Sequence, residues 1–189
     1  MSLPLSRDEL IRRVKAGEAF EYFLFYGHKP PQDGSVDSSC LSQWFQIDFE
    51  VDGIVYPTAE HWMMAEKARL FGDDEMLGEI LKAAGPKEAK AFGRKVQSFD
   101  QAVWAERRFE VVRRGNVEKF RQNPELKSFL LSTGETILVE AAGRDLIWGI
   151  GYGVNNEKAR DPLQWRGTNL LGFVLVEVRG LLGRGGDED

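Results

Sequence analysis

Residues 45–56, FQIDFEVDGIVY, constrain the fold more than any other part of this 189-residue chain. Apolar and polar residues alternate on both sides of Asp52-Gly53, as two antiparallel strands joined by a tight turn require. Thr58 then begins a long stretch, residues 58–123, in which caps and periodicity predict one helix after another. A hairpin followed by this much helix predicts an α+β fold that is predominantly helical.

The other elements follow from capping residues, breakers and hydrophobic periodicity. Ser6 and the acids after it predict a short first helix, and EYFLFY at residues 21–26 predicts a buried strand. Beyond the helix that Thr58 caps, helices are expected at residues 73–84, 86–96, 101–122, 124–134 and 169–182, with a strand at 136–142. Gly115 is expected to weaken the helix at 101–122. The sequence thus predicts about seven helices and one small hairpin-based sheet.

Length and composition are those of one compact domain. A chain of 189 residues rarely needs to divide, and 42% hydrophobic residues, with 12 Phe and 5 Trp, suffice for a substantial core. We expect an N-terminal helical extension at residues 1–21, one domain at 22–183 and a disordered tail at 184–189.

Charge and cysteine content exclude several classes of protein. A formal net charge of -5 argues against an extended basic groove for nucleic acid. The single cysteine, Cys40, cannot form an internal disulfide, and we expect a bystander thiol. Neither a signal peptide nor an apolar run of membrane-spanning length is evident, so a soluble, cytoplasmic protein without membrane contact is expected. The sequence indicates no oligomeric state.

The segment PTAEHWMMAEK, residues 57–67, contains the first candidate site. With Thr58 as N-cap, Glu60 falls in the first helical turn, where free N–H groups and the helix dipole favour an anion by roughly 0.3–1 kcal/mol. Lys67 lies seven residues on, close to two turns, and therefore on the same side. An ionised carboxylate beside apolar surface suits a reaction that develops positive charge. A first-turn acid is also a common structural residue, and that alternative stays open. His61 has no partner at metal-ligand spacing, so no metal site is expected.

A second candidate site is LVEAAGRDLIWGIGYG, residues 138–153. Asp145 and Trp148 precede three closely spaced glycines that begin at Gly149. Glycine admits close backbone approach to a ligand, and an indole offers a stacking face for a base or sugar. The spacing differs from the dinucleotide-binding fingerprint, and a plain glycine-rich turn remains the alternative.

Three further residues are candidates for ligand contact. Arg94 follows Gly93 near a helix end, where its guanidinium matches phosphate oxygens, and Trp104 lies one turn into the next helix. Asn169 comes at a helix N-terminus, which favours anionic or polar ligand groups. A surface arginine, a core tryptophan and simple capping are the corresponding structural alternatives.

Taken together and in this order, these motifs resemble the NADAR (NAD and ADP-ribose associated), YbiA-like family. The resemblance covers roughly residues 22–182, and its matching segments are Phe25-Tyr26, LSQWF, VDGIVYPTAEHWMMAEKA, Gly93-Arg94, Trp104, LVEAAGRDLIWGIG and NLLGFVLVEVR. The chain departs from the family at Ser42-Gln43-Trp44, where Ser-Asn-Phe is usual, so a polar contact near the sugar is expected to differ.

The resemblance implies a single NADAR-type domain and N-glycosidase chemistry without a cofactor. Such enzymes remove ribose phosphate from early intermediates of riboflavin synthesis, or ADP-ribose from modified guanine, free or on nucleic acid. Carried over by position, the catalytic residues are Glu60 and Asp145. The substrate-binding residues are Tyr26, Lys67, Arg94, Trp104, Trp148, Gly149 and Asn169. The alternative is a non-catalytic module that binds ADP-ribose or a nucleotide in the same pocket.

Overall fold

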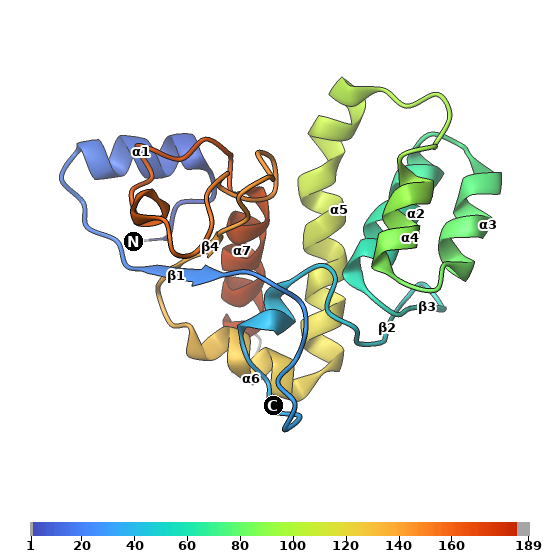
Figure 1. Ribbon diagram of the computed structural model, residues 1–189, viewed down its shortest axis with the longest axis horizontal. Coiled ribbons are helices and arrows are strands. Elements are labelled where there is room, and N and C mark those ends of the chain that lie inside the picture. Colours follow the sequence, from blue (N-terminus) through green and yellow to red (C-terminus); the bar gives the residue numbers. More distant parts are fainter. Residues whose placement is uncertain (1, 185–189) are drawn as a thin grey trace. The chain divides into compact units, whose positions relative to one another are not determined.

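The computed structural model describes residues 2–184 (Figure 1). The tail predicted at residues 184–189 lies outside the described residues, except for Arg184, which ends the last helix. No helix in this part of the chain has both the length and the apolar character that a bilayer span requires.

Seven α-helices and four short strands form the described chain, which confirms the predicted helix-rich α+β class. The helices are α1 (Arg7–Lys15), α2 (Ala59–Leu70), α3 (Asp74–Lys82), α4 (Pro86–Gly93), α5 (Gln101–Gln122), α6 (Pro124–Ser132) and α7 (Leu170–Arg184). The strands are β1 (Tyr22–Phe25), β2 (Phe49–Val51), β3 (Ile54–Tyr56) and β4 (Ile137–Glu140), and two 3-10 turns are η1 (Ser38–Leu41) and η2 (Glu157–Arg160). The first of these turns precedes the hairpin strands β2 and β3.

The chain divides into two compact units. Unit 1 comprises residues 1–42 and 125–189, and unit 2 comprises residues 43–124. The domain predicted for residues 22–183 therefore includes all of unit 2 and most of unit 1.

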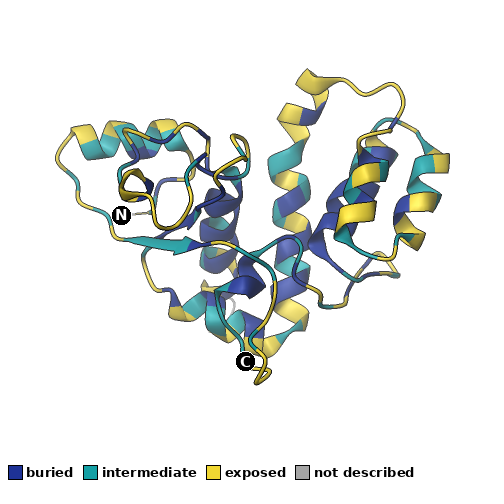
Figure 2. Cartoon of the chain, viewed as in Figure 1, coloured by how far each residue is buried: buried dark blue, intermediate teal, exposed yellow. Residues whose placement is uncertain are grey.

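Unit 2 begins with the predicted hairpin. Strands β2 and β3 pair antiparallel with Phe49 opposite Tyr56. Asp52 and Gly53 have φ of 52° and 79°, the left-handed values that a two-residue hairpin turn with two positive φ angles needs. Helix α2 follows and contacts α3, α4 and α5. Every residue of α2 from Ala59 to Ala65 is buried (Figure 2). This helix is therefore the core of unit 2 rather than a surface helix with one apolar face.

Helix α5 continues through Gly115 without interruption, contrary to the expected weakening. A Cβ atom at Gly115 would lie 2.1 Å from Cδ1 of Trp62. The glycine thus lets the indole of Trp62 pack on the helix backbone, and the indole N–H donates to the carbonyl of Val111 at 2.7 Å. This contact offsets the low helix propensity of glycine.

Unit 1 contains the second sheet, which the sequence did not predict as a pair. Strands β1 and β4 pair in parallel, with Tyr22 opposite Ile137 and Phe25 opposite Glu140. Helix α7 packs on β4, and most of its residues from Leu171 to Val178 are buried. The hairpin of unit 2 and this parallel pair are separate two-stranded sheets, in place of one hairpin-based sheet.

Candidate functional site

The nine predicted site residues are divided between the two units. Unit 2 contains Glu60, Lys67, Arg94 and Trp104, and unit 1 contains Tyr26, Asp145, Trp148, Gly149 and Asn169.

Glu60 is a buried carboxylate in the first turn of α2. Glu60 is 2% exposed. The hydroxyl oxygen of Thr58 caps the helix by accepting the N–H of His61 at 3.3 Å. The N–H of Glu60 itself donates to the backbone carbonyl of Gln43 at 2.9 Å. Burial near the positive end of a helix dipole strengthens any electrostatic action of this carboxylate, because water screens it less.

His61 has a structural role beside Glu60. Its Nε2 lies 3.2 Å from the carbonyl oxygen of Ala83, which can only accept, so Nε2 carries the proton. Its Nδ1 then accepts from the hydroxyl of Thr58 at 2.7 Å. Burial lowers the pKa of His61 below its ordinary value of 6.5, while the Ala83 carbonyl and Glu88 oppose this effect. A neutral imidazole thus joins the start of α2 to the end of α3. Within residues 2–184 no three His, Cys, Asp or Glu side chains are grouped as a metal site would need.

Lys67 and Arg94 form a pair of neighbouring cations. The ammonium of Lys67 donates to the carbonyl of Gly93 at 2.7 Å and lies 4.0 Å from the ring centre of Phe99. Burial lowers the pKa of Lys67, and the positive charge of Arg94 lowers it further. Among the described residues neither cation forms an ion pair with a carboxylate. Two adjacent cations without an acid are suited to a phosphate group.

Trp104 is largely covered. It lies in the first turn of α5 and is 7% exposed. Most of the Trp104 surface is therefore covered by packing within the protein, which is the structural alternative that the sequence left open.

In unit 1, Asp145 fixes the turn that carries Trp148. One carboxylate oxygen of Asp145 accepts the N–H of Ile147 at 2.9 Å and that of Trp148 at 2.7 Å. Trp148 is half-buried and Gly149 is buried. The predicted residues of this segment thus form one ordered loop after β4, while Tyr26 at the end of β1 is 66% exposed.

Asn169 is part of the framework of unit 1. It is fully buried with φ of 55°. Its Nδ2 donates to the carbonyl of Leu138 at 2.9 Å, and its Oδ1 accepts the N–H of Glu140 at 2.9 Å. Both polar atoms of the side chain are thereby used to hold β4 against the start of α7. Asn169 thus has a structural role, and the ligand contact expected from its place at a helix N-terminus stays a prediction. The hydroxyl of Thr168 donates to the carbonyl of Ile147.

Three buried polar residues of unit 2 were not among the predicted site residues. The side-chain oxygen of Gln43 accepts from Nδ2 of Asn116 at 2.8 Å. Lys119 is fully buried, with its ammonium 5.1 Å from the ring centre of Phe120 and 5.7 Å from that of Phe45. Asn116 and Lys119 occupy the same apolar stripe of α5 as Val112 and Phe120. Polar residues inside such a stripe are the sequence signal that would have identified them.

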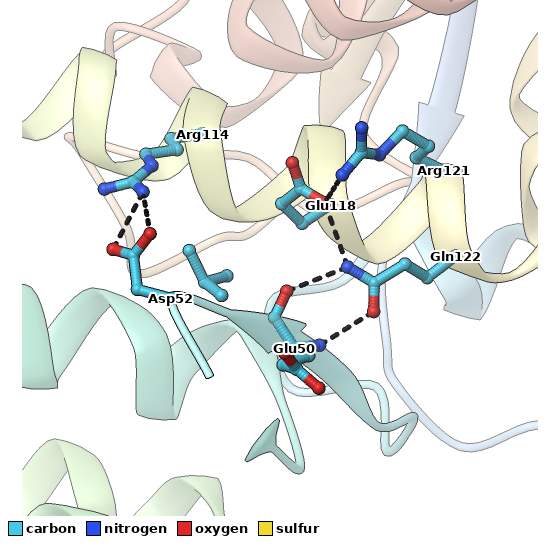
Figure 3. A pocket seen from close by; sticks show the side chains of 7 residues that line it. Glu50, Asp52, Arg114, Glu118, Arg121 and Gln122 are labelled. Atoms are coloured by element: carbon cyan, nitrogen blue, oxygen red, sulfur yellow. Dashed lines mark hydrogen bonds and ion pairs between the residues drawn. The ribbon is translucent and has the colours of Figure 1, made fainter. Parts of the chain in front are cut away.

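A polar groove elsewhere in unit 2 has about 530 Å³ of space but not the features of a reaction site (Figure 3). It lies between the hairpin and α5, and its lining residues are Glu50, Val51, Asp52, Arg114, Glu118, Arg121 and Gln122. Arg114 pairs with Asp52 at 2.7 Å, Arg121 pairs with Glu118 at 2.5 Å, and Gln122 bonds both backbone groups of Glu50. None of the predicted site residues lines this groove.

Comparison with known proteins shows the family. The NADAR domain matches residues 24–183. The chain is 38% identical to N-glycosidase R617 of Acanthamoeba polyphaga mimivirus over 167 residues. The matched region covers 86% of this chain and 96% of that protein. It is 32% identical over 143 residues to N-glycosidase YbiA of Escherichia coli, covering 76% and 79% of the two chains.

A solved structure agrees with this assignment. The NMR structure of E. coli YbiA matches with a TM-score of 0.71 at 27% identity, over 99% of this chain and 97% of that one.

A further sequence relative is the riboflavin biosynthesis protein VVA0006 of Vibrio vulnificus. It is 32% identical over 139 residues, which are 74% of this chain but 34% of that longer protein. With nearly the whole chain matched, this protein belongs to the NADAR family.

Proposed function

We propose that this protein is an N-glycosidase that hydrolyses an N-ribosidic bond. Relatives that match most of the chain are named N-glycosidases, which supports the reaction class. The observation that carries the proposal is the buried carboxylate of Glu60 in the first turn of α2.

The chemistry of the bond explains why such a carboxylate is needed. Breaking a C–N bond at an anomeric carbon builds positive, oxocarbenium-like charge on the ribose. A preorganised negative group in a water-poor site stabilises that charge without reorganising during the reaction. Glu60 therefore acts as the electrostatic stabiliser that also orients the attacking water, or as the nucleophile.

Lys67 and Arg94 are assigned to the phosphate of the substrate. Both proposed substrates, ADP-ribosylated guanine and a ribosylamino-pyrimidine phosphate, carry a phosphate on the ribose 5-position. The two cations lie close enough that Arg94 lowers the pKa of Lys67. An anion bound beside them relieves this repulsion, so we expect phosphate binding to raise the pKa of Lys67. The name of the Vibrio relative supports the riboflavin-pathway substrate.

The assignments of Asp145, Trp148, Gly149 and Tyr26 rest on the family resemblance and stay predictions. Asp145 is proposed to position or protonate the departing base, and Trp148 to stack on base or sugar. Asp145→Asn and Trp148→Ala, measured separately, test each role.

Glu60→Gln tests the central claim. We expect the variant to fold and to lose about 10²–10³ in turnover, the usual effect of removing one preorganised charged group. Purified protein is incubated with an ADP-ribosylated guanine oligonucleotide and, separately, with the ribosylamino-pyrimidine phosphate, and released base and sugar are separated by chromatography. Glu66→Gln is the matched control, because Glu66 is on the same helix but pairs with Arg69 at 2.6 Å. Near-full turnover by Glu60→Gln removes this residue from the reaction.

Calorimetry distinguishes an enzyme from a binding module. Tight binding of ADP-ribose by the wild-type protein, with no base or ribose released from either substrate, identifies a non-catalytic reader and contradicts the proposal.

A further inference from the structure

Two buried side-chain amides in unit 2, those of Gln43 and Asn116, are hydrogen-bonded in one fixed orientation. Nδ2 of Asn116 donates to the carbonyl of Val112 at 2.8 Å, and since a carbonyl only accepts, the atom facing it must be nitrogen. The same nitrogen donates to Gln43 at 2.8 Å, so the atom of Gln43 that faces it must be oxygen. Flipping either amide would place two donors or two acceptors together. The far atoms are therefore Nε2 of Gln43 and Oδ1 of Asn116.

These far atoms are a complementary donor and acceptor that the protein leaves unused. Nε2 of Gln43 and Oδ1 of Asn116 are both buried, and neither has a hydrogen-bond partner among the described residues. Gln43 is 6% exposed and Asn116 is fully buried. A buried polar atom without a partner is destabilising, and such atoms in native proteins call for a specific explanation. Packing alone does not explain the pair, because apolar residues of similar size would fill the same space.

The pair is directly connected to the proposed catalytic residue. The backbone carbonyl of Gln43 accepts the N–H of Glu60 at 2.9 Å, so the two residues are in contact. Because the two backbones are joined in this way, we take a group that bonds the Gln43 side chain to lie near the point at which Glu60 is proposed to act. In an N-riboside, the hydroxyl on the carbon next to the anomeric carbon is the group in that position.

We propose that Gln43 and Asn116 bind the 2-hydroxyl of the substrate ribose and make the protein selective for ribosides over 2-deoxyribosides. A hydroxyl group accepts from the amide N–H of Gln43 and donates to the carbonyl oxygen of Asn116, so one hydroxyl satisfies both atoms. This inference rests on the proposed function, because it takes Glu60 to face the anomeric carbon. A 2-deoxy sugar leaves the two amide atoms unpaired. Binding sites with buried groups that pair a hydroxyl reject an analogue without that hydroxyl most strongly.

Binding of two small sugars tests the inference without turnover. The probes are ribose 5-phosphate and 2-deoxyribose 5-phosphate, titrated into the wild-type protein by calorimetry. We expect the ribose compound to bind at least about tenfold more tightly, since a lost hydrogen bond that strands buried partners typically costs this factor or more. In Gln43→Met we expect the ratio of the two affinities to fall to within about twofold. Gln122→Met is the matched control, because Gln122 is an exposed amide on α5 whose bonds go to the backbone of Glu50.

The double variant Gln43→Met/Asn116→Leu keeps the test decisive if the single variant folds poorly. Replacing both members of the pair by apolar groups removes the unpaired atoms, so the melting temperature should equal or exceed that of the wild type. The double variant should still show no preference between the two sugars.

The outcomes are distinct. Equal affinity of the wild type for both sugars, as expected if an internal water satisfies the pair, overturns the inference, as does failure to bind either. A preference that survives in the variants also overturns it. Hydrolysis of the N-ribosides without a sugar preference leaves the proposed function intact while the inference fails. A sugar preference without any hydrolysis supports the binding pair and contradicts the glycosidase.

Discussion

The contact between Gly115 and Trp62 provides a stringent test of how unit 2 is packed. In an exposed helix, replacing glycine with alanine stabilises by about 0.8–1 kcal/mol, because glycine has the greater backbone freedom to lose. At Gly115 the added Cβ would lie 2.1 Å from Cδ1, 2.5 Å from Nε1 and 2.9 Å from Cγ of Trp62. The indole must therefore move, although it is fully buried in α2.

The expected loss follows from what the indole contacts. Forcing extra volume into a well-packed core typically costs about 1–3 kcal/mol. Displacing the ring also breaks the 2.7 Å bond from Nε1 to the carbonyl of Val111. A buried donor left without a partner costs about 1–3 kcal/mol more. After the gain in helix propensity, Gly115→Ala should lower the free energy of unfolding by roughly 3 kcal/mol, or the melting temperature by roughly 6–12 °C.

Gly78→Ala is the matched control for this substitution. Gly78 lies within α3, and a Cβ atom added there meets nothing within 4 Å. This variant should gain up to about 1 kcal/mol from helix propensity alone. Thermal denaturation by circular dichroism, with tryptophan fluorescence to follow Trp62, compares the two. If Gly115→Ala is as stable as Gly78→Ala, the inferred packing of Trp62 on α5 is wrong.

Three further predictions concern pH, the framework of unit 1 and phosphate binding. Since burial lowers the pKa of His61 below 6.5, the unfolded state binds the proton first as the pH falls, and stability should decline below pH 6.5 by at most about 1.4 kcal/mol per pH unit. Urea unfolding at pH 7.5 and 5.0 should show that the free energy of unfolding declines less in His61→Gln than in the wild type. The same decline in both proteins would contradict the role of His61. Asn169→Ala should cost roughly 2–5 kcal/mol in the same assay, because it strands the buried carbonyl of Leu138 and a second backbone group of β4; a loss below about 1 kcal/mol would argue against a framework role. Arg94→Ala should weaken ribose 5-phosphate binding about tenfold or more, as expected for a charge-assisted contact, while Lys95→Ala should change it little. If the two variants weaken binding of ribose 5-phosphate equally, Arg94 makes no specific phosphate contact and only general electrostatic attraction remains.

Local signals predicted the parts of the fold that depend on neighbouring residues. The Asp52-Gly53 turn, the cap at Thr58 and the first-turn position of Glu60 lie where the sequence placed them. Each depends on backbone preferences and hydrogen bonds that span only a few residues. Family motifs added the reaction class, because the matched segments extend through most of the chain.

Tertiary structure decided whatever depends on residues far apart in the chain. Strand β1 pairs with β4 more than 100 residues later, and parallel strands need a crossover that no local pattern specifies. Gly115 was predicted to weaken α5, but its missing side chain is what admits Trp62. The bond between Gln43 and Asn116 joins a loop to a helix 73 residues away. Residue type and spacing determine which groups a chain can present, whereas which of them meet, and which polar atoms are left for a ligand, is determined only when the core packs.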